Sequence, residues 1–167
     1  HWDVDVIVDY DHGNTYERTK ITIYTLSTDV DISVVPASGI IVAGQTVDLV
    51  VTETNDGDLP LTNVQVVVND GSSDIATLTS ATAIESMNND NILEVGETWT
   101  WNAATNPGPT NSLNDIVVND QTTFTATGSG TASSVVVTFP ADQDEQDSVT
   151  VYTLSTDVDI SVVPASG

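Results

Sequence analysis

Residues 24–39 read YTLSTDVDISVVPASG, and residues 152–167 repeat the same sixteen letters without a change. In the first copy Val30, Ile32 and Val34 alternate with polar residues, which is the period-two pattern of a half-buried β-strand. Pro36 lacks a backbone donor and is expected to end or bend that strand. An identical repeat of this length does not arise by chance, so it indicates that the chain is built from repeated units.

The two copies are offset by 128 residues, from Tyr24 to Tyr152, and a weaker similarity extends backwards from each. Glu17 matches Glu145, and ITI at 21–23 matches VTV at 149–151. Three parts are therefore predicted. Residues 1–23 are the closing hairpin of a preceding unit or a variant hairpin that starts the chain, 24–151 are one complete unit with 24–39 as its joint strand, and 152–167 open the next unit. A local duplication within one domain is the alternative.

The same period-two pattern recurs along the unit, and no window shows sustained helical periodicity. Turn residues such as Asn-Asp-Gly separate the apolar segments. Strands are predicted at 46–54, 61–68, 74–78, 97–101 and 116–127, with a final hairpin of 134–139 and 148–154 across the acidic loop DQDEQD. This count predicts an all-β fold, an immunoglobulin-like β-sandwich in a tandem or head-to-tail array.

Two motifs carry a family resemblance. Residues 44–68 read GQTVDLVVTETNDGDLPLTNVQVVV, residues 88–101 read NNDNILEVGETWTW, and 117–128 read VVNDQTTFTATG. Over residues 40–130 the chain resembles the repeat domains of the domain of unknown function 11 family. That resemblance implies an immunoglobulin-like sandwich in long tandem surface proteins of prokaryotes, with an architectural or adhesive function and no catalytic activity.

Composition restricts the partners. The chain has 25 Asp and Glu against two Lys and Arg, a net charge of −23 and no Cys. Nucleic-acid binding needs cations to displace counterions from phosphate, so it is not expected. Docking on anionic lipid is equally disfavoured, and no stretch approaches the length of a membrane span. The strong acidity suits high salt or divalent cations, and the composition predicts an extracellular, cell-surface protein.

An enzymatic function is not expected. Both histidines, His1 and His12, precede the complete unit, which therefore lacks the base of a nucleophilic triad. Paired carboxylates for glycoside chemistry are not excluded by counting. A catalytic unit in near-identical tandem copies would nevertheless be unusual.

Calcium is the candidate cofactor, because hard cations bind closely spaced oxygens of Asp, Asn and Glu. Three loops have that composition: 55–58, 88–97 and 142–147. The predicted ligands are Asn88, Asp90, Glu94 and Glu97 in the second loop, and Asp56 and Asp58 in the first. The alternative for each loop is a solvated turn, since Asp and Asn favour turns in any case.

The predicted interface between units is the joint strand and its copy. It comprises Val30, Ile32 and Val34, their copies Val158, Ile160 and Val162, and Trp2 as an aromatic anchor. Packing of Trp2 on its own hairpin is the alternative. Trp99 and Trp101 share one strand face and are interpreted as a core pair in preference to a carbohydrate platform.

The predicted function is that of a structural subunit of an extracellular filament, stalk or surface layer. Its partners would be copies of itself, joined head to tail through shared or exchanged β-strands. The alternative is an adhesive module for a carbohydrate or cell-surface ligand, with the polar loop 102–114 as the contact surface.

Overall fold

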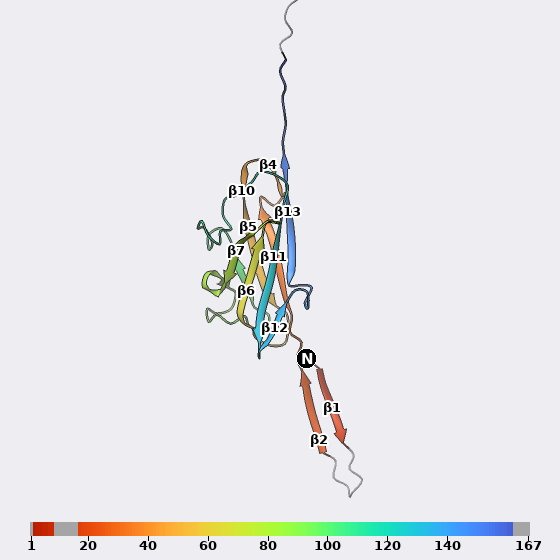
Figure 1. Ribbon diagram of the computed structural model, residues 1–167. Helices are drawn as coiled ribbons and strands as arrows, with labels where there is room; N and C mark the ends of the chain where they lie inside the picture. Colours follow the sequence, from red (N-terminus) through yellow and green to blue (C-terminus); the bar gives the residue numbers. More distant parts are fainter. Residues whose placement is uncertain (1, 9–16, 162–167) are drawn as a thin grey trace, which may run out of the picture.

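The computed structural model describes residues 2–8 and 17–161, and it is all-β, with two sheets that form a β-sandwich-like body (Figure 1). The first sheet contains β3 (Thr28–Val35), β5 (Gln45–Asn55), β8 (Ile84–Glu85), β9 (Thr98–Trp101) and β10 (Ile116–Val118). The second contains β4 (Ile40–Val42), β6 (Thr62–Asn69), β7 (Asp74–Thr79), β11 (Thr122–Ala132), β12 (Val135–Thr138) and β13 (Gln146–Leu154). A single 3₁₀ turn, η1 (Ser80–Thr82), follows β7. No helix among the described residues is long and apolar enough to cross a membrane.

The first sheet is built around β5, which pairs antiparallel with β3 along most of its length and with β9 and β10 over shorter stretches. Alternate β5 residues, Val47, Leu49 and Val51, are buried. β3 shows the same alternation from its first to its last residue and ends before Pro36. The prediction of a half-buried strand at Val30, Ile32 and Val34 is therefore confirmed.

The second sheet is built around β11, which pairs with β6 on one edge and with both β12 and β13 on the other. The predicted hairpin between 134–139 and 148–154 is wrong, because β12 folds back on β11. Ser133 and Ser134 both have positive φ, as a two-residue hairpin turn that matches strand twist requires. β13 then continues along the same edge of β11, end to end with β12.

Both sheets contribute to one hydrophobic core. Trp99 and Trp101 of β9 lie at its centre, fully buried and edge to face, with ring centroids 6.2 Å apart. This is a preferred geometry for aromatic pairs. The interpretation of the two tryptophans as a core pair is confirmed, and they offer no exposed platform.

The segment from β3 to β4 crosses from one sheet to the other. β3 pairs with β5 in the first sheet, whereas β4 runs parallel to the end of β13 in the second, with Tyr152 opposite Ile40. The start of the unit is thereby tied to both sheets.

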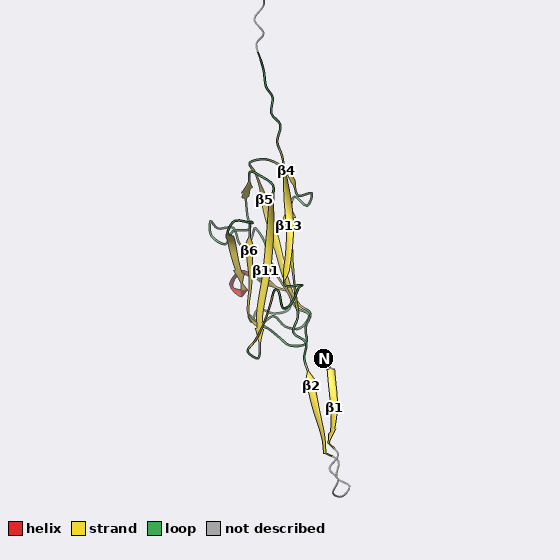
Figure 2. Cartoon of the chain, turned by 45° about the vertical axis from the view of Figure 1, so that its right-hand side comes forward, coloured by secondary structure: helices red, strands yellow, loops and turns green. Residues whose placement is uncertain are grey.

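Two extensions leave the sandwich at opposite ends (Figures 1 and 2). β1 (Trp2–Val8) and β2 (Glu17–Ile23) form an antiparallel hairpin beyond the end where β3 begins. At the other end β13 continues into residues 155–161, an extended segment without ladder partners that carries the described part of the second copy.

Candidate functional site

Within the predicted joint segment 24–39, the strand itself is β3 (Thr28–Val35), and the name joint strand is used for β3 from here on. It is hydrogen-bonded along both edges. One edge forms the antiparallel ladder with β5. On the other edge the amide of Val30 donates to the carbonyl of Asp144 at 2.9 Å, and the amide of Ile32 donates to Asp147 Oδ2 at 3.0 Å. The amide of Thr28 donates to Asp142 Oδ2 at 3.4 Å. The acidic loop 142–147 therefore acts as a docking edge for the joint strand.

The joint strand and its copy have opposite environments. Val30 and Ile32 are 1% and 6% exposed, whereas the identical residues of the copy, Val158 and Ile160, are 79% and 84% exposed. Val34 is buried beside Val30 and Ile32. Val162 and the side chain of Trp2 lie outside the described part of the chain. The same sequence thus forms a core strand in the first copy and an exposed, extended segment in the second copy.

The turn at residues 55–58 clamps the linker that precedes the joint strand. The amides of Gly57 and Asp58 donate to the carbonyls of Ser27 and Thr25 at 3.0 and 2.8 Å, and Asp58 Oδ2 accepts from the amide of Thr25 at 2.9 Å. A β-carbon at Gly57 would lie 2.7 Å from the Ser27 nitrogen, so only glycine allows this approach. Asp58, a predicted calcium ligand, therefore serves the clamp, while Asp56 is exposed beside it.

The N-terminal hairpin is antiparallel, with Trp2 opposite Ile23 and Val8 opposite Glu17. Ile23 faces Trp2 in the hairpin, and Val151, which stands 128 positions after Ile23, faces Thr122 in the sandwich. At the offset of 128 residues β2 aligns with residues 145–151, whereas β1 aligns with residues 130–136, which do not pair with β13.

A pair of carboxyl groups lies beneath the start of the joint strand. Glu53 belongs to β5, directly opposite Val30, and Glu145 immediately precedes β13. Both glutamates and Thr28 are fully buried, and Thr28 Oγ1 donates to Glu145 Oε1. Both carboxyl oxygens of Glu53 and Oε2 of Glu145 have no hydrogen-bond partner. Glu53 and Glu145 are called the carboxyl pair below.

Gly128 of β11 makes room for the carboxyl pair. It stands at an inward-facing position, and a β-carbon there would collide with Oε2 of Glu145 and lie 2.6 Å from Oε2 of Glu53. The amide of Gly128 donates to the Glu145 carbonyl at 2.9 Å, which fixes that glutamate opposite the glycine. The two carboxyl groups therefore converge on one small space between the sheets.

Burial governs the protonation of this pair. Burial, then the charge of Glu145, raises the pKa of Glu53 to about 9. Burial also raises the pKa of Glu145 to about 7, and the Thr28 hydroxyl opposes both shifts. Residues 21–161 contain no Lys or Arg that could neutralise the pair. At neutral pH Glu53 therefore holds a proton, since two carboxylates this close in a dry site do not both ionise.

Sequence reasoning missed this pair as a unit, although it placed Glu145 in a candidate calcium loop. The available signal was the alternation of β5, in which Glu53 follows Val47, Leu49 and Val51 on the inward face. An acidic residue at such a position is seldom buried without a partner.

The outer face of the joint strand is strongly acidic. Partial burial, and then the charges of Asp31, Asp144, Asp56 and Asp147, raise the pKa of Asp29. The aspartates of the strand and of its docking loop thus repel one another, which a saline medium would relieve.

The second predicted calcium loop is organised around its own backbone. The fully buried Glu97 accepts the amides of Met87 at 3.3 Å and Glu94 at 2.9 Å. Asn88 donates to Glu94 at 3.0 Å, and Asp90 Oδ1 accepts from the amide of Ile92 at 3.0 Å. Within the described ranges no three His, Cys, Asp or Glu residues are placed to hold a metal ion together. Calcium at this loop remains a prediction.

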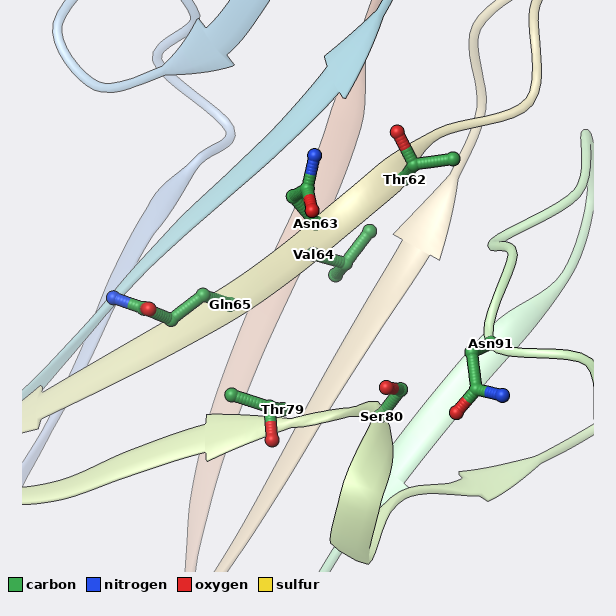
Figure 3. A pocket seen from close by; sticks show the side chains of 7 residues that line it. All are labelled: Thr62, Asn63, Val64, Gln65, Thr79, Ser80 and Asn91. Atoms are coloured by element: carbon green, nitrogen blue, oxygen red, sulfur yellow. The ribbon is translucent and has the colours of Figure 1, made fainter.

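A polar pocket of about 420 Å³ opens beside β6 and the end of β7 (Figure 3). It is lined by hydroxyl and amide side chains and by one apolar residue, namely Thr62, Asn63, Val64, Gln65, Thr79, Ser80 and Asn91. No charged or aromatic side chain lines it. The predicted ligand loop 102–114 is instead largely bound to itself, with Asn106 buried and donating to the carbonyl of Asn111 at 3.2 Å.

Comparison with family models, with curated proteins and with solved structures finds no match to this chain. The resemblance to the domain of unknown function 11 family therefore remains a prediction from the motifs.

Proposed function

We propose that this protein is a structural subunit of an extracellular filament, stalk or surface layer, whose units are joined through shared or exchanged β-strands. One observation carries the proposal: the core strand β3 recurs letter for letter in an extended segment whose Val158 and Ile160 are almost fully exposed. Burying such side chains contributes about 1.5–3 kcal/mol each. Their burial requires a second body with the groove that β3 fills, either a following unit or another copy of the chain.

The strand order supports an immunoglobulin-like sandwich. β3, β5 and β9 take the places of strands A, B and E in one sheet, and β6, β11 and β13 take those of C, F and G in the other. We propose that the motif resemblance over residues 40–130 reflects this relationship, with units arranged in tandem.

The N-terminal hairpin supports a head-to-tail arrangement. Residues 17–23 align with residues 145–151 at the same offset as the two identical copies, which supports residues 1–23 as the closing hairpin of a preceding unit. Residues 24–151 then form the complete unit, and 152–167 provide the first strand of the next.

Apolar side chains at both ends of the sandwich support contacts between units. Tyr24, Val135 and Val136 are exposed at the end near the hairpin, where they help line a pocket of about 510 Å³. Val42 and Leu154 are exposed at the end from which the second copy leaves (Figure 1). End-to-end stacking would cover both groups, as neighbouring units do in repeat proteins.

The test is assembly of the whole chain. We expect the protein to form end-to-end oligomers that grow with concentration, seen by light scattering and as fibres in electron micrographs. The double variant Val158→Asp/Ile160→Asp should remain monomeric. Val117→Asp, which changes an exposed valine of β10 outside the repeated segment, should still assemble. A wild-type chain that is monomeric at every concentration would eliminate exchange between chains.

The polar pocket favours a second candidate, an adhesive module. Its amide and hydroxyl groups suit hydrogen bonding to a carbohydrate, although no aromatic ring is present for stacking. A glycan array with wild type and Gln65→Ala tests this candidate. A signal that the variant loses would support adhesion, and no signal would retire it.

A further inference from the structure

The hydroxyl group of Thr28 in the joint strand lies against the carboxyl group of Glu145, the residue that immediately precedes β13. Thr28 Oγ1 contacts Glu145 Oε1, and both residues have no solvent-exposed surface. The backbone fixes both partners, because the Thr28 amide is bound by Asp142 and the Glu145 carbonyl is bound by the Gly128 amide. A nucleophile and an acyl carbon are thus held together in a dry space.

A third group completes the arrangement. Glu53 is fully buried, and the polar side chains that act most strongly on its carboxyl group are Glu145 and Thr28. The space above Gly128, which both carboxyl groups enter, brings Glu53 next to Glu145 and Thr28.

From this geometry we propose that Thr28 and Glu145 form an intramolecular ester, which links the first strand of the unit covalently to the last.

The reaction is a condensation without oxidant or cofactor. Thr28 Oγ1 attacks Cδ of the protonated Glu145, an Oγ1–Cδ bond forms, and the Cδ–OH bond breaks. Glu53 accepts the hydroxyl proton on one oxygen and donates its own proton from the other to the departing hydroxyl, so that one water molecule is released. Glu53 ends as it began, as the neutral acid.

Two features of the site drive this condensation forward. Well-oriented groups within one molecule react with effective concentrations of about 10⁵ M or more, which outweighs the water that opposes ester formation. The product also removes one of two acids from a space where ionised carboxylates are costly. The raised pKa values of both glutamates supply the neutral forms that the reaction needs.

The test is intact-mass spectrometry of the folded full chain. We expect a mass lower by one water molecule than the sequence requires, and a proteolytic map in which the peptide with Thr28 is joined to the peptide with Glu145. Hydroxylamine should separate the two peptides. Succinimide formation at Asp56-Gly57 or Asp70-Gly71 also loses water, so localisation decides: a deficit at either aspartate, or no deficit, overturns the ester.

Matched variants separate chemistry from folding. Thr28→Ser keeps the hydroxyl and should retain the deficit, whereas Thr28→Val keeps the shape and should lose it. Glu53→Gln should slow the appearance of the ester after refolding by about a hundredfold, the usual scale of acid–base assistance. A deficit that persists in Thr28→Val overturns the proposal. So does a Thr28→Ser chain that folds, by circular dichroism, at full mass.

Discussion

Glu53 places a fully buried carboxyl group among the apolar side chains of the core. Its neighbours on the inward face of β5 are aliphatic, and its cross-strand partners are Val30 and Trp99. Burial there, and then the charge of Glu145, raises the pKa of Glu53 to about 9. Glu53 is therefore a protonated, neutral side chain inside the sandwich at neutral pH.

The first prediction is a loss of stability with rising pH. A folded-state pKa of about 9 against an ordinary value of 4.5 means that the folded chain holds more protons than the unfolded chain between those values. The contribution of Glu53 to the free energy of unfolding should be complete below about pH 4.5 and fall until about pH 9. Each pKa unit corresponds to about 1.4 kcal/mol, so the total is of the order of several kcal/mol.

The control is Glu53→Gln, measured by urea unfolding in the same buffers. Exposed carboxylates finish ionising near pH 6, and Glu145 has a pKa of about 7, so the slope between about pH 8 and 9 reports chiefly on Glu53. That slope should flatten in the variant. Equal slopes for both proteins in this window would contradict the prediction.

The tryptophan pair supplies a second prediction, because the two rings are equally buried but differently bonded. Trp101 Nε1 donates to the carbonyl of Thr79 at 2.9 Å, whereas Trp99 Nε1 has no partner. Phenylalanine removes similar volume at both positions. Trp101→Phe should therefore cost about 1–2 kcal/mol more than Trp99→Phe, the value of one buried hydrogen bond. Equal unfolding free energies in urea would refute this difference.

At the scale of elements, the two edges of the joint strand are bound differently. One edge forms a backbone ladder with β5, and the other is held mainly by side chains of the acidic loop. Its outer edge is held by the backbone of Asp144 and by the carboxylates of Asp142 and Asp147. The acidity of the loop thus has a local structural use in addition to any cation that it attracts.

The third prediction concerns Asp147→Ala, which removes the acceptor of the Ile32 amide. Hydrogen exchange of Ile32 should accelerate by about tenfold, the effect of losing one bond of about 1.4 kcal/mol. Amides of β6 and β7 should keep their rates. Asp74→Ala, at an exposed position of β7, is the matched control and should leave Ile32 unchanged. Acceleration in both variants would indicate general destabilisation and refute the specific role.

Elements with a clear local pattern were predictable, and those that depend on distant contacts were not. Alternation located β3, β5, β6, β7 and the tryptophans of β9, because one face of each strand is buried. The partner of β12 was missed because Ser133-Ser134 lacks the Asn-Gly or Asp-Gly signature of the turn that it forms.

The candidate site was predictable only in outline. The repeat identified the joint strand and its copy from the sequence alone, whereas the exposure of the copy came from the structure. The carboxyl pair was not visible as a pair, because Glu53 and Glu145 lie far apart in the sequence and meet only when the two sheets close over Gly128. Glu97 was proposed as a metal ligand from its composition, but its oxygens accept amides of its own loop.

At the scale of the whole molecule, the identical copies allow one strand to be tested in two settings. In the present chain Val30 is buried and Val158 is exposed. Val30→Asp should therefore cost about 3–5 kcal/mol, the penalty of an unpaired buried charge, and Val158→Asp should leave the monomer's unfolding unchanged.

The fourth prediction is that this difference disappears when a second unit follows. Because residues 152–167 equal 24–39, appending residues 40–154 after Gly167 makes a seamless two-unit chain. The copy then has its own groove, with a β5 on one edge and an acidic docking loop on the other. The calorimetric unfolding enthalpy should roughly double, since it scales with the number of folded residues. Val158→Asp should now unfold the second unit alone, and Val30→Asp the first alone. If Val158→Asp has no effect in the two-unit chain, the copy is not the opening strand of a unit, and the repeat must be explained as a local duplication.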